Sequence, residues 1–178
     1  GSICYGKNAA GEQFRCGGGG HIIDDPGSGY ALGRDALAAA LQTEDGRLSE
    51  NALHGAVMDT VGGSGIQGIF DFVYFSRRGK GDIAALAPLV LRCAAQGDAV
   101  SLDILRRGAA ELARLVSAVM GKLGLENGSP CALAGGLLAE ENVYRRAVCA
   151  ALAPFCRPAA PEHDALFGAV QLALAAIQ

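Results

Sequence analysis

The chain has 178 residues, of which 51% are hydrophobic, and this is sufficient for one domain with a sizeable core. The formal net charge is -3 at pH 7, and the largest basic cluster is Arg77, Arg78 and Lys80, so the charge pattern excludes a typical nucleic-acid-binding surface. The longest apolar runs fall well short of the roughly 20 residues that cross a bilayer. No charged segment followed by an apolar stretch opens the sequence. We therefore expect no signal peptide, no membrane partner and a soluble cytoplasmic domain.

The first 30 residues predict a β-hairpin followed by a glycine-rich loop. Residues 2–5 and 13–16 flank a turn-rich segment and are expected to pair as two strands. The four glycines of Gly17–Gly20 then lead into a loop that ends at Ser28, which is expected to cap the first helix.

This loop is the first candidate for chemistry. Consecutive glycines remove side chains from a surface, so a ligand can approach the main-chain amides there. Asp24 and Asp25 follow the glycines, and a carboxylate at this place could accept hydrogen bonds from ligand hydroxyl groups, as a sugar would offer. The alternative is that Asp25 only complements the positive N-terminus of the following helix.

Helices are expected to dominate the middle of the chain, at residues 30–41, 49–61, 66–75, 82–95 and 101–123. The 66–75 segment could also be extended, although its aromatic spacing favours a helix. The 82–95 segment is apolar on nearly every face, so we expect it to be buried. Pro88 should either kink that helix or lie where a backbone hydrogen bond is already missing. The apolar residues of 101–123 alternate steps of three and four, which predicts an amphipathic helix.

Two strand–helix units are expected to complete the chain. Residues 131–134 form a short apolar run that ends in Gly135-Gly136 and precedes a helix at 142–152. Residues 155–157 can form a second strand, and Asp164 is expected to cap a last helix that extends to Ile177. A hairpin, a helical block and two strand–helix units indicate an α/β fold, with a mixed sheet covered by helices. The absence of a linker-like segment favours a single domain over 1–178.

Nucleotide binding has a weaker signal. No G-x-x-x-x-G-K-[ST] motif is present, which excludes a P-loop NTPase. Gly135-Gly136 could let a nucleotide lie against bare backbone close to a helix N-terminus, although a tight turn explains the same pattern. The three histidines, His21, His54 and His163, lack a nearby serine or cysteine elbow and indicate no catalytic triad.

Six cysteines are scattered along the chain without any C-x-x-C pair: Cys4, Cys16, Cys93, Cys131, Cys149 and Cys156. Their neighbours are small or apolar. We expect most of them to be buried free thiols, because zinc and iron–sulfur sites normally need closely spaced thiolates.

An ordered set of motifs carries a family resemblance. It comprises Gly1-Ser2, then C-G-G-G-G-H at 16–21, D-P-G-S-G-Y-A-L-G at 25–33, I-A-A-L-A at 83–87, L-A-G-G at 133–136 and D-A-L-F-G-A at 164–169. In this order they resemble the N-acetylglucosamine kinases of the BadF/BadG/BcrA/BcrD ATPase family. The resemblance covers essentially the whole chain. It implies a ribonuclease-H-like lobe of the actin-like ATPase type, namely the C-terminal one of the two lobes that close over ATP.

The resemblance also implies roles for residues. Ser2, Asp25 and the glycines Gly18, Gly19 and Gly20 would contact the sugar. Gly1 would end a phosphate motif, Ala84 would touch the nucleotide, and Gly135-Gly136 would lie at the adenosine. The implied activity is phosphorylation of an amino sugar by ATP with Mg²⁺, and members of this group often dimerise through this lobe.

Departures from the family pattern affect the choice of sugar. The family's loop tryptophan is Gly19 here, the acidic residue after Asp25 is Pro26, and Ile3 replaces a residue that is polar in some members. Losing the tryptophan removes a stacking surface, so glucosamine or another hexosamine is an alternative to N-acetylglucosamine. The catalytic aspartate of the family has no match here, so no catalytic residue is assigned, and residues 1–178 alone are expected to be inactive.

Two functions of other kinds fit the same family or fold. An activator ATPase would drive electron transfer through a bridging iron–sulfur cluster, which the scattered cysteines do not favour. A sensor domain would bind a sugar or nucleotide without catalysis.

Overall fold

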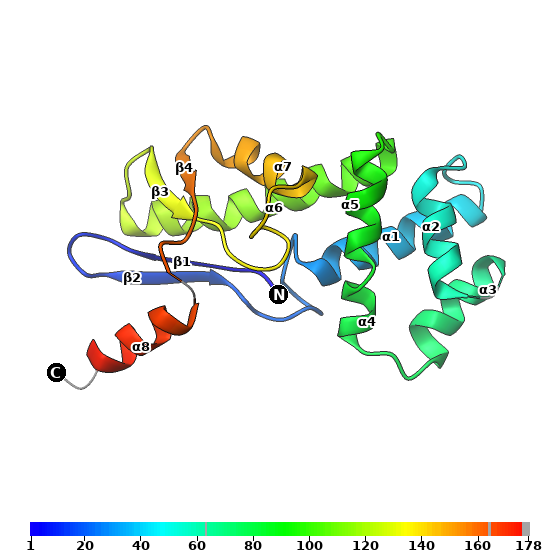
Figure 1. Cartoon of the computed structure of the whole chain (residues 1–178), viewed down its shortest axis with the longest axis horizontal. Helices are drawn as coiled ribbons and strands as arrows, with labels where there is room; N and C mark the ends of the chain where they lie inside the picture. The colour runs from blue at the N-terminus through cyan, green and yellow to red at the C-terminus, as the bar shows by residue number, and fades with distance from the viewer. Residues whose placement is uncertain (63, 164, 176–178) are drawn as a thin grey trace.

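The computed structural model describes residues 1–62, 64–163 and 165–175. A helical block occupies one end of the molecule and two small sheets the other, and a long helix connects them (Figure 1). The elements are β1 (Ile3–Lys7), β2 (Gln13–Gly17), α1 (Gly29–Glu44), α2 (Ala52–Val61), α3 (Gly65–Phe70), the π-helix η1 (Asp71–Phe75), α4 (Lys80–Ala84), α5 (Ala87–Ala95), α6 (Ala99–Leu123), β3 (Ser129–Ala132), α7 (Val143–Leu152), β4 (Cys156–Ala159) and α8 (Ala165–Ala175).

The strands form two separate two-stranded sheets. β1 and β2 pair antiparallel, with Cys4 opposite Cys16, and β3 and β4 pair parallel. The expected hairpin and both later strands are therefore confirmed. Parallel and antiparallel pairing both occur, as expected of a mixed sheet, but among the described residues the two pairs are not hydrogen-bonded to each other.

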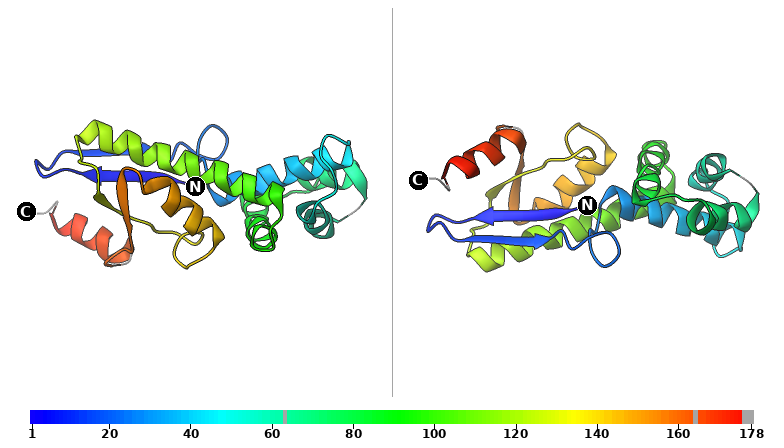
Figure 2. Two further views of the ribbon diagram at one scale, coloured as in Figure 1. Left: turned by 90° about the horizontal axis from the view of Figure 1, so that it is seen from above. Right: turned by 90° about the horizontal axis from the view of Figure 1, so that it is seen from below.

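A cavity of about 370 Å³ lies between the two sheets. Every residue of β1 and every residue of β3 lines it, so each strand presents an edge to the other. Side chains of α6, among them Val116, Val119 and Met120, close it on another side. The hairpin lies alongside α6 in both views of Figure 2, and residues of both its strands contact that helix.

Polar residues cap the helices where the sequence has them. The hydroxyl oxygen of Ser28 accepts the Ala31 N–H at 3.2 Å, which confirms the predicted cap of α1. Asn51, Asp98 and Asn142 accept main-chain N–H groups in the same way at α2, α6 and α7. The cap expected from Asp164 lies outside the described residues, as does the end of the last helix at Ile177.

The segment predicted as one helix over 82–95 is two helices, α4 and α5. Pro88 lies in the first turn of α5, where its missing N–H breaks no intrahelical bond. Of the two alternatives for Pro88, the structure therefore shows the position where a backbone hydrogen bond is already missing, and not a kink. α5 buries Leu89, Val90 and Cys93 among other residues, as expected of an apolar helix.

The core lies where α1, α5, α6 and α7 meet. The predicted apolar seam of α6 is buried at Leu105, Ala109, Val119 and Leu123, whereas Leu102 is 42% exposed. The 66–75 segment is helical throughout, as α3 followed by η1. No single helix in the described ranges is long and apolar enough to cross a membrane. Only the run from α4 to α6, bent by 118°, passes that test of length and composition.

All six cysteines are free thiols, and Cys93 and Cys156 are buried while the other four are partly buried. Burial, with a smaller contribution from neighbouring thiols, raises the pKa of Cys4 to about 11 and that of Cys156 to about 11. Among the residues with described positions, no group of three His, Cys, Asp or Glu could hold a metal ion. The prediction that most of the cysteines are buried is therefore met fully only at Cys93 and Cys156.

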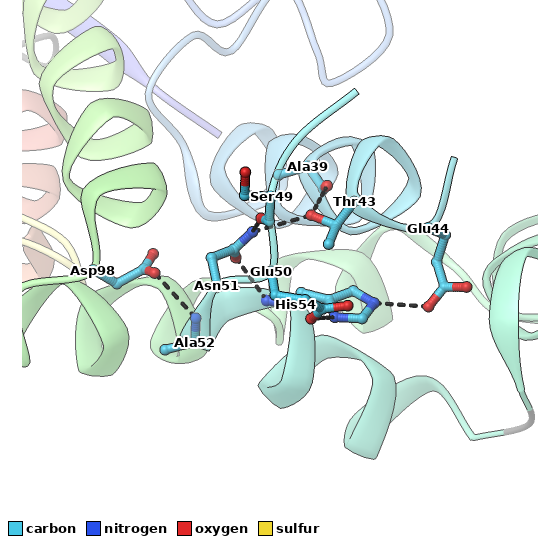
Figure 3. A network of polar contacts seen from close by, with 9 residues as sticks. All are labelled: Ala39, Thr43, Glu44, Ser49, Glu50, Asn51, Ala52, His54 and Asp98. Atoms are coloured by element: carbon cyan, nitrogen blue, oxygen red, sulfur yellow. Dashed lines mark hydrogen bonds and ion pairs between the residues drawn. The ribbon is translucent and has the colours of Figure 1, made fainter. Parts of the chain in front are cut away.

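A polar network joins α1 to α2 and α6 (Figure 3). His54 lies between two carboxylates, with Nε2 2.7 Å from an oxygen of Glu44 and Nδ1 3.0 Å from an oxygen of Glu50. Asp98 accepts the N–H of Ala52 through one oxygen and that of Ser101 through the other, so one side chain caps two helices. The network fixes the start of α2 against its neighbours.

His54 makes the stability of this junction depend on pH. Burial lowers the pKa of His54, but the hydrogen bonds to Glu44 and Glu50 outweigh it and raise that pKa above its ordinary value of 6.5. A group whose pKa is higher in the folded than in the unfolded protein stabilises the folded state. This stabilisation is complete at pH values below the pKa of the unfolded state, and it is lost as the pH rises through the pKa of the folded state. The free energy of unfolding of the wild type should therefore exceed that of His54→Gln most at about pH 5.5 and least at about pH 9. Urea unfolding across this range measures the difference, and a difference that stays constant or widens with pH would contradict the assignment.

Candidate functional site

A cleft of about 790 Å³ opens where the start of β1, the loop before α1, the helix α4 and the loop after β3 meet. Six of the residues singled out in the sequence line it: Gly1, Ser2, Asp25, Ala84, Gly135 and Gly136. They come from four segments that are far apart in the chain. The fold therefore brings the predicted sugar side and the predicted nucleotide side to one cavity.

Asp25 is the carboxylate of this cleft. It is only 8% exposed, and its Oδ1 accepts the Ser2 N–H at 3.2 Å. Its backbone has a φ of 57°, which is rare for a residue with a side chain but tolerated by aspartate and asparagine. A Cβ on Gly1 would lie 2.9 Å from Oδ2, so the main chain passes close to the carboxylate. An ionised carboxylate only accepts hydrogen bonds, and Asp25 has acceptor capacity left for ligand hydroxyls.

Ser2 connects the start of β1 to the same loop. Its hydroxyl donates to the Pro26 carbonyl at 2.7 Å, which leaves the oxygen free to accept a hydrogen bond. Ser2 and Asp25 are thus fixed relative to each other by two hydrogen bonds across the loop.

The glycines Gly18, Gly19 and Gly20 do not line the cleft. The Gly19 N–H donates to the Asp24 carboxylate at 2.8 Å, and the Asp24 N–H donates to the Gly20 carbonyl at 2.8 Å. A side chain on Gly19 would meet the Asp24 carboxylate, at 2.9 Å from Cβ to Oδ2. The glycine stretch therefore closes into a small loop at the outer end of the Asp25 segment.

The buried phenol of Tyr144 holds the loop before α1 in place, and sequence reasoning missed it. Tyr144, on α7, donates to the Gly27 carbonyl at 2.7 Å, and burial raises the pKa of its hydroxyl. Gly27 has a φ of 68°, and a Cβ there would lie 2.6 Å from the Gly108 carbonyl oxygen and 2.7 Å from the Tyr144 hydroxyl. Only glycine fits this position, so the loop before α1 packs directly against α6 and α7.

Removing this phenol should loosen the loop. Tyr144→Phe keeps the ring but leaves the Gly27 carbonyl buried without its donor, so we expect a loss of about 1–2 kcal/mol in the free energy of unfolding. Chemical denaturation monitored by circular dichroism measures this loss. A Tyr144→Phe protein as stable as wild type would show that water or another donor replaces the hydroxyl.

The glycine pair Gly135-Gly136 contributes bare backbone to the lining of the cleft. Gly135 has a φ of 98°, and a Cβ on Gly135 or Gly136 would meet no atom within 4 Å. The open space beside this backbone can accommodate a flat ligand group. Ala84 ends α4, and Lys80 begins that helix and adds a positive charge to the lining. In the sequence Lys80 belongs to the small basic cluster with Arg77 and Arg78, which by itself gives no sign of a cleft.

The rings of His21 and Tyr30 also line the cleft. Their centroids are 4.7 Å apart and their planes meet at 73°, an edge-to-face contact. The sequence analysis gave neither residue a ligand role, because the eight residues between them conceal that the two rings meet.

Comparison with known proteins agrees with the resemblance. The sequence profile of the BadF/BadG/BcrA/BcrD ATPase family matches residues 1–173. An N-acetylmuramic acid/N-acetylglucosamine kinase of Clostridium acetobutylicum is 40% identical over 127 residues, which are 71% of this chain and 42% of that protein. An N-acetyl-D-glucosamine kinase of Dictyostelium discoideum is 30% identical over 151 residues, 83% of this chain and 46% of that protein. The chain thus spans less than half the length of either relative.

A solved structure confirms the fold. A protein of Chromobacterium violaceum assigned as an N-acetylglucosamine kinase superposes with a TM-score of 0.76 and 31% identity, covering 97% of this chain and 56% of that one. The expected α/β lobe of the actin-like ATPase type is therefore confirmed. With the family profile matching nearly the whole length, the chain belongs to the BadF/BadG/BcrA/BcrD ATPase family.

Proposed function

We propose that this chain is the sugar- and nucleotide-binding part of an ATP-dependent amino-sugar kinase. The observation that carries the proposal is the single cleft that Asp25 and Ser2 share with Ala84 and the Gly135-Gly136 backbone. A carboxylate beside a serine suits the hydroxyl groups of a sugar, and exposed backbone suits a nucleotide. Phosphoryl transfer depends mainly on positioning two substrates, and one shared cleft supplies that.

ATP and Mg²⁺ are the cofactors that this function needs. Gly135 and Gly136 would lie against the adenosine, with Ala84 and Gly1 towards the rest of the nucleotide, and Lys80 would add positive charge near the phosphates. In kinase sites Mg²⁺ is bound largely by the nucleotide's phosphates with one or two carboxylates, so a cage of protein ligands is not required of this chain.

The general base that takes the proton from the sugar hydroxyl is assigned to polypeptide outside these 178 residues, because none of the described cleft residues has that role in the family pattern. Ser2 and Asp25 would bind the sugar, whereas the cleft lining does not support the same role for Gly18, Gly19 and Gly20. We expect residues 1–178 alone to have no kinase activity.

A coupled ADP-release assay tests the proposal. The full-length protein should release ADP with N-acetylglucosamine, N-acetylmuramic acid or glucosamine, and residues 1–178 alone should not. If the full-length protein turns over none of these sugars, the proposal is wrong. Sugar binding without ATP consumption would instead identify a sensor.

We place the enzyme in the cytoplasm, because ATP is available there and six free thiols suit a reducing compartment. The family resemblance also suggests a homodimer, which analytical ultracentrifugation of the full-length protein would test.

A further inference from the structure

The cleft wall next to Asp25 carries an aromatic pair. His21 lies four residues before Asp25 in the same loop, and Tyr30 lies at the start of α1. Both residues line the cleft and are partly buried. The edge-to-face geometry, at 4.7 Å and 73°, restricts how the imidazole can turn.

The His21 imidazole has no hydrogen-bonding partner in the part of the chain that the structure describes. Among the described residues, the ring contact with Tyr30 is the interaction that holds His21, and neither ring nitrogen has a polar partner. His54, in contrast, has a carboxylate at each nitrogen. A half-buried histidine fixed by one ring contact therefore keeps both nitrogens available to a ligand in the cleft.

A sugar needs the two properties that this pair offers. Its ring presents a face of C–H groups that packs on an aromatic surface, and its rim presents hydroxyl or acetamido groups that need hydrogen-bond partners. The loop offers no other aromatic ring near Asp25, since Gly18, Gly19 and Gly20 have no side chains and the next two residues are Ile22 and Ile23, which are 83% and 87% exposed.

We propose that His21 contacts the sugar in this cleft, packing its ring on the sugar and offering a ring nitrogen to a polar substituent, and that Tyr30 is the positioning residue that orients it. This inference rests on the proposed function and adds a residue that determines sugar specificity. In this arrangement the sugar lies between the His21 ring and the Asp25 carboxylate, and the aromatic surface comes from the position after the glycines.

Steady-state kinetics of the full-length protein with two variants tests the role of His21. His21→Ala should raise KM for the amino sugar about tenfold and leave KM for ATP within about twofold. His21→Phe keeps the ring without its nitrogens and should raise KM for the sugar only about threefold. Tyr30→Ala removes the edge-to-face contact that orients the imidazole and should raise KM for the sugar about threefold, with KM for ATP within about twofold of wild type.

Ile22→Ala is the matched control, because Ile22 is the next residue of the loop but does not line the cleft. It should match wild type in both KM values. If the wild type is active and His21→Ala leaves KM for the sugar unchanged, His21 has no contact with the sugar and this inference alone is wrong. An equal rise in both KM values together with a lower melting temperature would show a purely structural role and also overturn it.

Saturation-transfer NMR with N-acetylglucosamine separates the remaining outcomes. If the wild type binds the sugar without turnover, the ratio of the Kd of His21→Ala to that of wild type tests the contact of His21 with the sugar. We expect a ratio of about ten, and a ratio of about one would contradict the contact. A wild type that neither binds nor phosphorylates an amino sugar overturns the proposed function and this inference together.

Discussion

Asp25→Asn should reduce kcat/KM for the amino sugar about 100-fold in the full-length protein, while KM for ATP changes little. A hydrogen bond to a charged acceptor contributes about 1.5–3 kcal/mol, and each 1.36 kcal/mol corresponds to about a tenfold change in rate. Asparagine keeps the size of the side chain and tolerates the φ of 57°, so the change removes the charge and leaves the backbone conformation. Sugar-dependent ADP release, titrated against each substrate, measures the effect.

Asp24→Asn is the matched control for this change. Asp24 is the preceding carboxylate, but it accepts the Gly19 N–H and does not line the cleft. Its replacement should lower kcat/KM by no more than about threefold, because an amide oxygen can accept the same bond. Equal losses from both variants would mean that the charge of the loop, and not a contact of Asp25 with the sugar, supports activity.

Gly33→Ala should destabilise the protein by about 3 kcal/mol or more. A Cβ on Gly33 would lie 1.9 Å from the carbonyl oxygen of Ile83 and 2.9 Å from its carbonyl carbon. These are backbone atoms, so the contact cannot be relieved by a side-chain rotation, and α4 would have to move away from α1. Ala84 and Lys80 move with α4, so the part of the cleft that is proposed to bind the nucleotide should be lost as well. Urea unfolding gives the free energy, and KM for ATP reports the cleft.

Gly55→Ala makes the same chemical change in an open place. Gly55 lies within α2, and a Cβ there would meet no atom within 4 Å. Alanine is the better helix former, so this variant should gain about 0.5–1 kcal/mol. A Gly33→Ala protein that is as stable as Gly55→Ala would show that α1 and α4 do not pack as closely as described.

The local elements could be predicted from the sequence because their signals are local. The hairpin, the Ser28 cap and the long helix at 101–123 each follow from turn residues, a capping hydroxyl or apolar spacing, and all three are confirmed. For Pro88 the sequence allowed either a kink within one helix or a place in a first helical turn, and helix propensity cannot separate the two. The packing of α4 against α1 decides where the chain breaks.

The site could be predicted only in part. Six of its residues were available from an ordered set of motifs, and the cleft brings those six together. Tyr144 and Lys80 carry no motif, because their roles depend on contacts over long sequence separations, such as the separation of 117 positions between Tyr144 and Gly27. The glycines of 18–20 predict a ligand surface by composition, but they do not line the cleft, and the Gly19 N–H donates to the Asp24 carboxylate.

The two short sheets have a consequence for handling this chain in solution. β1 and β3 face each other with open edges across an apolar cavity, and the main-chain N–H and C=O groups of such edges pair readily with strands of other molecules. Only Lys7, on β1, places a charge among the residues of these two strands. Residues 1–178 produced by themselves should therefore associate and precipitate as their concentration rises. Polypeptide that covers the edges of β1 and β3 should keep the protein in solution.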